Sequence, residues 1–210
     1  MEQRFKSRPT DVFIVSFPKS GTTWLAAMIF ATMTRTNYPL EQHPLLTHHP
    51  EQCVSSMEKE FATGRSQIIE AIPSPRGVNG FGPIWNHVLG YWEESKRRPE
   101  KVLFLKYENI MQEPVKHAKQ LAHFIGCPYS EAEESKGVVE QIVESCSFQK
   151  LKNLDGNKSG IFAVSGHHIS HSYFFRKGEA GDWKNHLTQE MAEKLDTIIE
   201  EKFKGSGLKI

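Results

Sequence analysis

The chain has 210 residues, of which 38% are hydrophobic and 24% charged, and its formal net charge is +1 at pH 7. This length predicts one globular domain over 1–210 with a core of its own, and no apolar run approaches the roughly 20 residues of a membrane span. A net charge so close to zero gives no global field for nucleic acid or for a membrane surface, so any anion site must be local.

The apolar runs, the helical spacings and the Gly and Pro stops predict the elements in chain order. They are a strand over 11–17, a turn over 18–22, a helix over about 22–34, a polar loop over 40–60, a weak strand over 67–72, a helix over 83–96, a buried strand over 102–107, helices over 113–125 and 131–145, a long irregular loop over 147–175 and a final helix over 188–204. In the final helix we expect an inward face of Met191, Leu195, Ile198 and Ile199. Strands that alternate with helices are typical of an α/β fold with a parallel sheet.

The cysteines and the first residues bear on the compartment. Cys53, Cys127 and Cys146 are odd in number, widely spaced and in no CxxC or Cys/His cluster. They predict reduced thiols, with neither a disulfide frame nor a metal site. The first residues lack the apolar segment of a secretory signal. We therefore expect a cytoplasmic protein.

The stretch SFPKSGTTW, residues 16–24, has the layout of a phosphate cradle. Gly21 permits a backbone conformation in which successive N–H groups converge on one anion, and the helix that follows adds its positive end. Lys19 supplies a mobile cation, the neighbouring hydroxyls supply donors, and Trp24 is a flat partner for a base. Lys19 precedes the only glycine, unlike the lysine of GxxxxGK[ST], so the loop suits a single phosphate better than a triphosphate with magnesium. A plain capped strand–turn–helix is the competing interpretation.

A second basic motif, FFRKGEAGDWKNHLT, covers residues 174–188. Arg176 is a bidentate donor for phosphate, Lys177 is a point charge, and Gly178 lets the backbone approach. A solvated basic turn over a small apolar cluster is the alternative. Two phosphate-type motifs about 150 residues apart indicate a ligand with two separate phosphates.

These two motifs, with GPIWNHVLGYW, VLFLKYENI and CSFQKL, resemble the cytosolic PAPS-dependent sulfotransferases, most closely those of the plant flavonol and brassinosteroid type. The resemblance covers about residues 5–60 and 77–210. It implies a P-loop-NTPase-like α/β fold with part of the central sheet missing. It also implies transfer of a sulfuryl group from 3′-phosphoadenosine 5′-phosphosulfate (PAPS) to a hydroxyl of a small organic acceptor, such as a flavonoid or steroid, without a metal. A homodimer through Lys184–Glu193 is a further implication.

The resemblance also implies roles for individual residues. Lys19 would be catalytic, because it would stabilise charge on the bridging oxygen of the leaving group. The cofactor contacts would be Lys19, Ser20, Gly21, Thr22, Thr23 and Trp24 at the 5′-phosphosulfate, Tyr107 beside the adenosine, Cys146, Ser147, Phe148, Gln149, Lys150 and Leu151 at the adenine, and Phe174, Phe175, Arg176, Lys177 and Gly178 at the 3′-phosphate.

The family's middle third has no counterpart in this sequence. It contains a strand that ends in a TH-P motif with the catalytic histidine, and an RDPKD…S motif whose Arg and Ser hold the 3′-phosphate. Neither pattern occurs here, and FAT at 61–63 is followed by Gly64 where the histidine would stand, so we place the junction near 61–77. His48 and His49 are the only histidines in a loop that could fold back toward Lys19. We therefore expect negligible transfer by the isolated chain.

Three other functions stay open. The first is a non-catalytic protein that binds PAP (3′-phosphoadenosine 5′-phosphate) or PAPS. The second is a small-molecule kinase or other P-loop NTPase, against which the order Lys-Ser-Gly and the RKGEAGDW stretch argue. The third is a structural subunit that pairs with an intact paralogue through KNHLTQEMAE, which partly matches the family's dimer motif.

Overall fold

The computed structural model describes residues 8–17, 19–54, 83–164 and 167–209. Within these ranges the helices are α1 (Thr22–Thr34), α2 (Pro50–Cys53), α4 (Ile84–Arg97), α5 (Tyr107–Gln112), α6 (Pro114–Phe124), α7 (Glu131–Ser135), α8 (Val138–Ser145), α9 (Phe148–Asn153), α10 (Asp155–Ser159) and α11 (Gln189–Phe203). Short 3₁₀ turns are η1 (Leu40–Gln42), η2 (Pro44–Leu46), η3 (His171–Phe174) and η4 (Asp182–Asn185). No helix in the described ranges is long and apolar enough to cross a bilayer.

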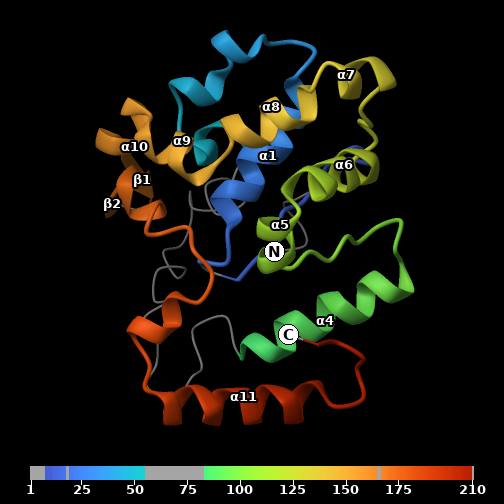
Figure 1. Ribbon diagram of the computed structural model, residues 1–210, viewed down its shortest axis with the longest axis vertical. Helices are drawn as coiled ribbons and strands as arrows, with labels where there is room; N and C mark the ends of the chain where they lie inside the picture. Colours follow the sequence, from blue (N-terminus) through green and yellow to red (C-terminus); the bar gives the residue numbers. More distant parts are fainter. Residues whose placement is uncertain (1–7, 18, 55–82, 165–166, 210) are drawn as a thin grey trace.

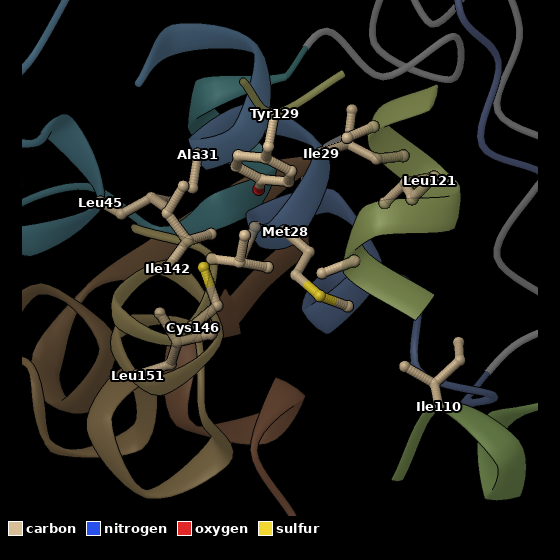
Figure 2. Packing of buried hydrophobic residues seen from close by; sticks show 14 of the residues in the cluster. Met28, Ile29, Ala31, Leu45, Ile110, Leu121, Tyr129, Ile142, Cys146 and Leu151 are labelled. Atoms are coloured by element: carbon tan, nitrogen blue, oxygen red, sulfur yellow. The ribbon is translucent and has the colours of Figure 1, made fainter. Parts of the chain in front are cut away.

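The core forms around α1, which has apolar residues on all sides. Such a helix is stable only when other elements cover it completely, and Ala27 and Met28 are accordingly buried. Helices α6 and α8 pack on α1 and on each other, and Figure 2 shows Leu121 of α6 and Ile142 of α8 directed toward Met28. A buried hydrogen bond of 3.0 Å between Thr32 Oγ1 and the Tyr129 hydroxyl satisfies these two polar groups within the core.

The predicted helices over 22–34, 83–96 and 113–125 are confirmed within a residue or two. The helix expected over 131–145 is instead two helices, α7 and α8. Gly137 separates them with φ 70°, a left-handed conformation that interrupts the hydrogen-bond ladder. Ser130 and Glu133 close a capping box at the start of α7, so α7 begins as a helix of its own.

The predicted strands over 11–17 and 102–107 are wrong. Both segments lie outside any strand among the described residues, and Tyr107 already begins α5. Val12 and Val15 are 39% and 49% exposed, whereas a central parallel strand buries both of its faces. An extended apolar segment becomes a strand only when a neighbour supplies the hydrogen-bond ladder. The weak strand expected over 67–72 lies outside the described residues.

The long loop predicted over 147–175 is also wrong, because the segment contains α9, α10, η3 and a hairpin. Its strands β1 (Ile161–Val164) and β2 (His167–Ser170) pair antiparallel, with Ile161 opposite Ser170. This hairpin is the one sheet that the described residues form. Helix α9 begins with a capping serine, because the Ser147 hydroxyl accepts a hydrogen bond from the Lys150 N–H.

Helices α4 and α11 form a second layer at one end of the molecule, below the bundle of α1, α6 and α8 (Figure 1). The Trp92 indole N–H of α4 donates to the Ser206 carbonyl just after α11, at 3.0 Å. The inward face predicted for α11 is only partly right. Ile198 and Ile199 are partly buried, whereas Met191 and Leu195 are 51% and 41% exposed. The fully buried residues of α11 are instead Ala192 and Phe203.

Candidate cofactor site

The cradle at the start of α1 has the backbone geometry of an anion site. Gly21 is the residue before the helix and has φ 96°, and no side chain caps this end of α1. The first N–H groups of a helix have no partner inside the helix. These N–H groups point away from the helix at its N-terminus, which carries a partial positive charge. Helices bind phosphate at this end.

Lys19 stands beside these N–H groups in a strained conformation. Its φ of 69° is the one positive value of a non-glycine residue in the described ranges, and an L-residue adopts it at a cost of about 1 to 2 kcal/mol. The ammonium donates a hydrogen bond of 3.0 Å to the Tyr173 carbonyl, across 154 residues of sequence. Burial, and then the positive charge of Arg176, lower the pKa of Lys19. The structure thus brings the two basic motifs to one place.

The hydroxyls of the cradle are engaged within the protein. Ser20 Oγ donates to the Phe17 carbonyl at 2.6 Å, and Thr23 Oγ1 donates to Glu51 Oε1 at 3.3 Å. The Thr22 hydroxyl is hydrogen-bonded to the Ser16 hydroxyl. These contacts hold the turn in shape, and a hydroxyl can rotate to give its proton to an incoming anion.

Tyr107 and Trp24 form an aromatic wall next to Gly21. Their rings meet edge to face with centroids 5.8 Å apart. A Cβ placed on Gly21 would lie 2.9 Å from the Tyr107 ring, so this close approach requires glycine as much as the φ value does. The Trp24 indole N–H is buried and has no hydrogen-bond partner among the described residues. A buried donor without a partner is uncommon in proteins and fits a position that a ligand or a water completes.

The RKG loop, residues 174–178, packs on the segment expected at the adenine. Gly178 has φ 69°, and a Cβ there would collide with the Phe148 ring. Phe148 also lies against Phe175, with ring centroids 6.1 Å apart. Cys146 and Leu151 belong to the core, and burial raises the pKa of the Cys146 thiol to about 12. Their side chains are therefore unavailable to a ligand, whereas Gln149 and Lys150 are exposed.

Asp182 organises the cations of the RKG loop. Its side chain is only 4% exposed and forms ion pairs with Lys177 at 2.5 Å and with Arg176 at 3.1 Å. Asn185 Nδ2 donates to the same carboxylate at 3.1 Å. The hydrogen bond from Lys177 is the main reason why the pKa of Asp182 lies well below its usual value. The sequence alone assigned no role to Asp182, because its contacts with Arg176 and Lys177 depend on the turn η4.

The histidines considered as bases have structural roles. His49 is fully buried, and its Nδ1 accepts from the Glu51 N–H at 3.1 Å to cap α2. Its ring packs on Phe174 with centroids 4.9 Å apart, and the Phe174 centroid is 5.5 Å from Lys19 Nζ. His48 is exposed, with Nδ1 2.9 Å from Thr47 Oγ1. The position of Gly64 lies outside the described residues.

A cavity of about 240 Å³ lies away from the cradle. Its walls are mainly leucine side chains between η1, η2 and the end of α8, and its lining residues are Leu40, His43, Leu45, Leu46, Glu144, Ser145, Lys150 and Leu154. Of the expected cofactor residues, only Lys150 reaches it.

Comparison with known proteins identifies the family. The sulfotransferase domain model matches residues 9–80 and 75–207. The chain belongs to the sulfotransferase family. Flavonol 3-sulfotransferase of Flaveria bidentis is 36% identical, with 99% of this chain and 86% of the relative covered. Cytosolic sulfotransferase 8 of Arabidopsis thaliana is also 36% identical, with 99% and 81% covered.

Two solved structures show the fold. One is an Arabidopsis thaliana protein assigned to the steroid sulphotransferases, with 27% identity and a TM-score of 0.66 over 99% of this chain and 81% of that one. The other is a mouse sulfotransferase in complex with PAP, with 24% identity and a TM-score of 0.63 over 96% and 86%. This sulfotransferase therefore has the α/β fold class of its family, although its described residues contain little strand.

The alignment with the Flaveria relative is longer than this chain. It runs over 268 positions, whereas the chain has 210 residues, so at least 58 positions of the alignment have no residue of this chain. The two segments of the family match meet at residues 75–80.

Proposed function

We propose that this sulfotransferase binds PAPS between the cradle, residues 19–24, and the RKG loop, and transfers its sulfuryl group to a hydroxyl of a small organic acceptor. The observation that carries the proposal is the 3.0 Å hydrogen bond from the Lys19 ammonium to the Tyr173 carbonyl, which places the cradle beside the start of the RKG loop. A helix N-terminus with basic side chains next to it is a site for an anion.

The residues of the site divide between the two ends of the ligand. Lys19 and the N–H groups of α1 would hold the 5′ end, and Arg176 and Lys177 would hold the 3′-phosphate. One ion-pair contact with Asp182 leaves most of the five N–H donors of Arg176 for a ligand. Trp24, Tyr107 and Phe148 are the aromatic surfaces that remain for the base. Sulfuryl transfer resembles phosphoryl transfer, in which positioning and charge stabilisation do most of the work.

The acceptor, the junction and the compartment belong to the same proposal. Flavonol and steroid names among the similar proteins support a phenolic or steroid hydroxyl as the acceptor. The family match changes segment at residues 75–80, and at least 58 positions of the alignment have no residue of this chain. Both observations support a missing block at the end of the 61–77 region, within a single domain. The relatives that are named cytosolic support a cytoplasmic location.

We further propose a homodimer through Lys184–Glu193. Met191 lies in this segment and Trp183 and Leu195 flank it, and all three side chains are more than 40% exposed. A second copy of the chain is the partner that would cover these side chains.

A second candidate function is PAP or PAPS binding without transfer. It is favoured by the buried position of His49, which caps α2 and stacks on Phe174. A general base must reach the proton of the acceptor hydroxyl, and loss of such a base usually costs a factor of about 10² to 10⁴ in rate. If this second candidate is right, the chain binds PAP and its transfer activity lies at the limit of detection.

Calorimetry with PAP and with adenosine 5′-phosphate tests the assignment of the two ends. Lys19→Ala should weaken both ligands by roughly 10- to 100-fold, the usual value of a charge-assisted hydrogen bond. Arg176→Ala should weaken PAP by a similar factor and leave adenosine 5′-phosphate unchanged. Lys136→Ala, an exposed lysine outside the site, is the control. A folded sample without affinity for PAP, or with magnesium-dependent ATP turnover, would contradict the proposal.

A radiolabelled transfer assay with PAPS separates the two candidate functions. Any transfer should fall more in Lys19→Ala than the PAPS affinity falls, because a cation on the bridging oxygen acts most when charge develops there. Equal losses would restrict Lys19 to ground-state binding. Rapid turnover by the unmodified chain would reject the non-catalytic alternative.

A further inference from the structure

We propose that Tyr173 is a positioning residue for Lys19: its ring and its main-chain carbonyl hold the Lys19 ammonium on the RKG loop until an anion at the cradle takes it over. This inference rests on the proposed function, because it gives a second partner to the lysine that we assign to the leaving group.

Three contacts meet at the Lys19 ammonium. Its Nζ is 3.0 Å from the Tyr173 carbonyl oxygen, 3.8 Å from the centroid of the Tyr173 ring and 5.5 Å from that of the Phe174 ring. At 3.8 Å the charge is well inside the distance at which the face of a ring attracts a cation. The carbonyl oxygen supplies a directional acceptor at the same time.

The exposure of Tyr173 indicates that its ring does not serve the core. The residue is 65% exposed, among the highest values of the large apolar and aromatic side chains described. Its neighbours in the chain are different, since Phe174 packs against the core and Phe175 is buried in it. An aromatic ring at the surface, with a cation over its face, fits a role in holding that cation.

The neighbouring charge explains why Lys19 needs such a partner. Arg176 is near enough to lower the pKa of Lys19, and burial acts in the same direction. Asp182, the buried carboxylate that follows the RKG loop, pairs with Arg176 and Lys177. The ring and carbonyl of Tyr173 are thus the electron-rich groups on which Lys19 rests when no anion is bound.

An anion must compete with this arrangement. A ligand shifts an equilibrium only by its difference in affinity for the two states, so contacts that stabilise the ligand-free position of Lys19 weaken anion binding. Tyr173→Ser removes the ring and keeps the carbonyl. We expect it to strengthen PAP binding about two- to fivefold, which corresponds to an exposed cation–π contact of about 0.5 to 1 kcal/mol. Tyr173→Phe keeps both contacts and should bind PAP as the unmodified chain does.

Lysine NMR reports the contact directly. Reductive methylation with ¹³C-formaldehyde labels each lysine and preserves its charge, and Lys19→Arg identifies the Lys19 signal. A methyl group over an aromatic face is shifted upfield by the ring current. We expect this shift in the unmodified chain and in Tyr173→Phe, and its loss in Tyr173→Ser and on addition of PAP. Tyr38→Ser, at an exposed tyrosine beyond the end of α1, is the control.

The outcomes separate this inference from the proposed function. A Lys19 signal without an upfield shift, or a Tyr173→Ser variant with weaker PAP binding, overturns the role of Tyr173. An upfield shift in a chain that binds no PAP rejects the proposed function and, with it, the competition. Loss of the shift together with tighter PAP binding in Tyr173→Ser alone supports both.

Discussion

Several side chains in this protein connect segments that lie far apart in the sequence through hydrogen bonds and ion pairs. Arg35 is an example, since its guanidinium pairs with Glu133 at 2.7 Å and donates to the Thr32 and Pro128 carbonyls. The side chains of Arg35 and Glu133 are only 10% and 25% exposed. The hydrogen bond from Arg35 is the main reason why the pKa of Glu133 falls to about 2. This pair joins the end of α1 to the start of α7.

We expect Glu133→Gln to lower the free energy of unfolding at pH 7 by about 1 to 2 kcal/mol, the difference between charged and neutral hydrogen bonds. Because the folded pKa of Glu133 is depressed, its contribution is complete above the ordinary value of 4.5 and is lost as the pH falls from 4.5 to about 2. The free energy of unfolding of the variant should therefore fall less steeply than that of the unmodified chain as the pH is lowered over that range. Urea denaturation at a series of pH values measures this dependence.

The neighbouring Glu134→Gln is the matched control, because Glu134 pairs with Lys119 on the surface and both side chains are about 40% exposed. Such pairs contribute little. Gln at position 133 can also complete the capping box, so the difference reports the charge alone. A parallel pH dependence in the two variants would contradict the role assigned to the Arg35–Glu133 pair.

At the scale of elements, the sequence predicted the helices better than the strands. A helix satisfies its own backbone. Helix α1 could be found from the apolar run after the cradle, and α6 from its apolar spacing and the stop at Gly126. A strand depends on a partner segment, and the apolar run at 102–107 has no ladder in the described ranges. Propensity alone could not show this dependence on neighbours.

The residue types of the two basic motifs were enough to find them in the sequence. Their proximity in the structure agrees with the prediction that both bind one ligand. The residues of the protein that pair with these basic side chains could not be found from residue type. Tyr173 and Asp182 bind Lys19, Arg176 and Lys177 through the folding of η3 and η4, and no periodicity in the sequence predicts those turns.

Two glycines, Gly178 in the RKG loop and Gly181 just after it, provide a test at this scale. Gly178 and Gly181 both have positive φ, 69° and 83°, so alanine at either costs about 1 to 2 kcal/mol in the backbone. A Cβ at Gly178 also collides with Phe148, whereas one at Gly181 meets nothing within 4 Å. We expect Gly178→Ala to weaken PAP binding and lower the melting temperature more than Gly181→Ala. Equal effects of the two variants would show that the packing on Phe148 is unimportant.

For the whole molecule, the exposed face of α11 predicts assembly. Met191→Glu should dissociate the proposed dimer, because it would bury an unpaired charge at an apolar position of the proposed interface. Sedimentation velocity over a range of concentrations measures the outcome. Thr197→Glu adds the same charge to an exposed position of α11 outside Lys184–Glu193 and should leave the assembly unchanged. A chain that is monomeric before substitution, or a dimer that survives Met191→Glu, would contradict this interface.

The central position of α1 has a consequence for synthesis on the ribosome. Helix α1 leaves the exit tunnel early, yet Ile142 of α8, which covers it, follows more than 100 residues later. At about 5 to 20 residues per second, the nascent chain carries this largely apolar helix incompletely covered for on the order of 10 s. During that interval α1 is a binding segment for chaperones that recognise apolar stretches, and the rate of translation between α1 and α8 sets how long they are needed.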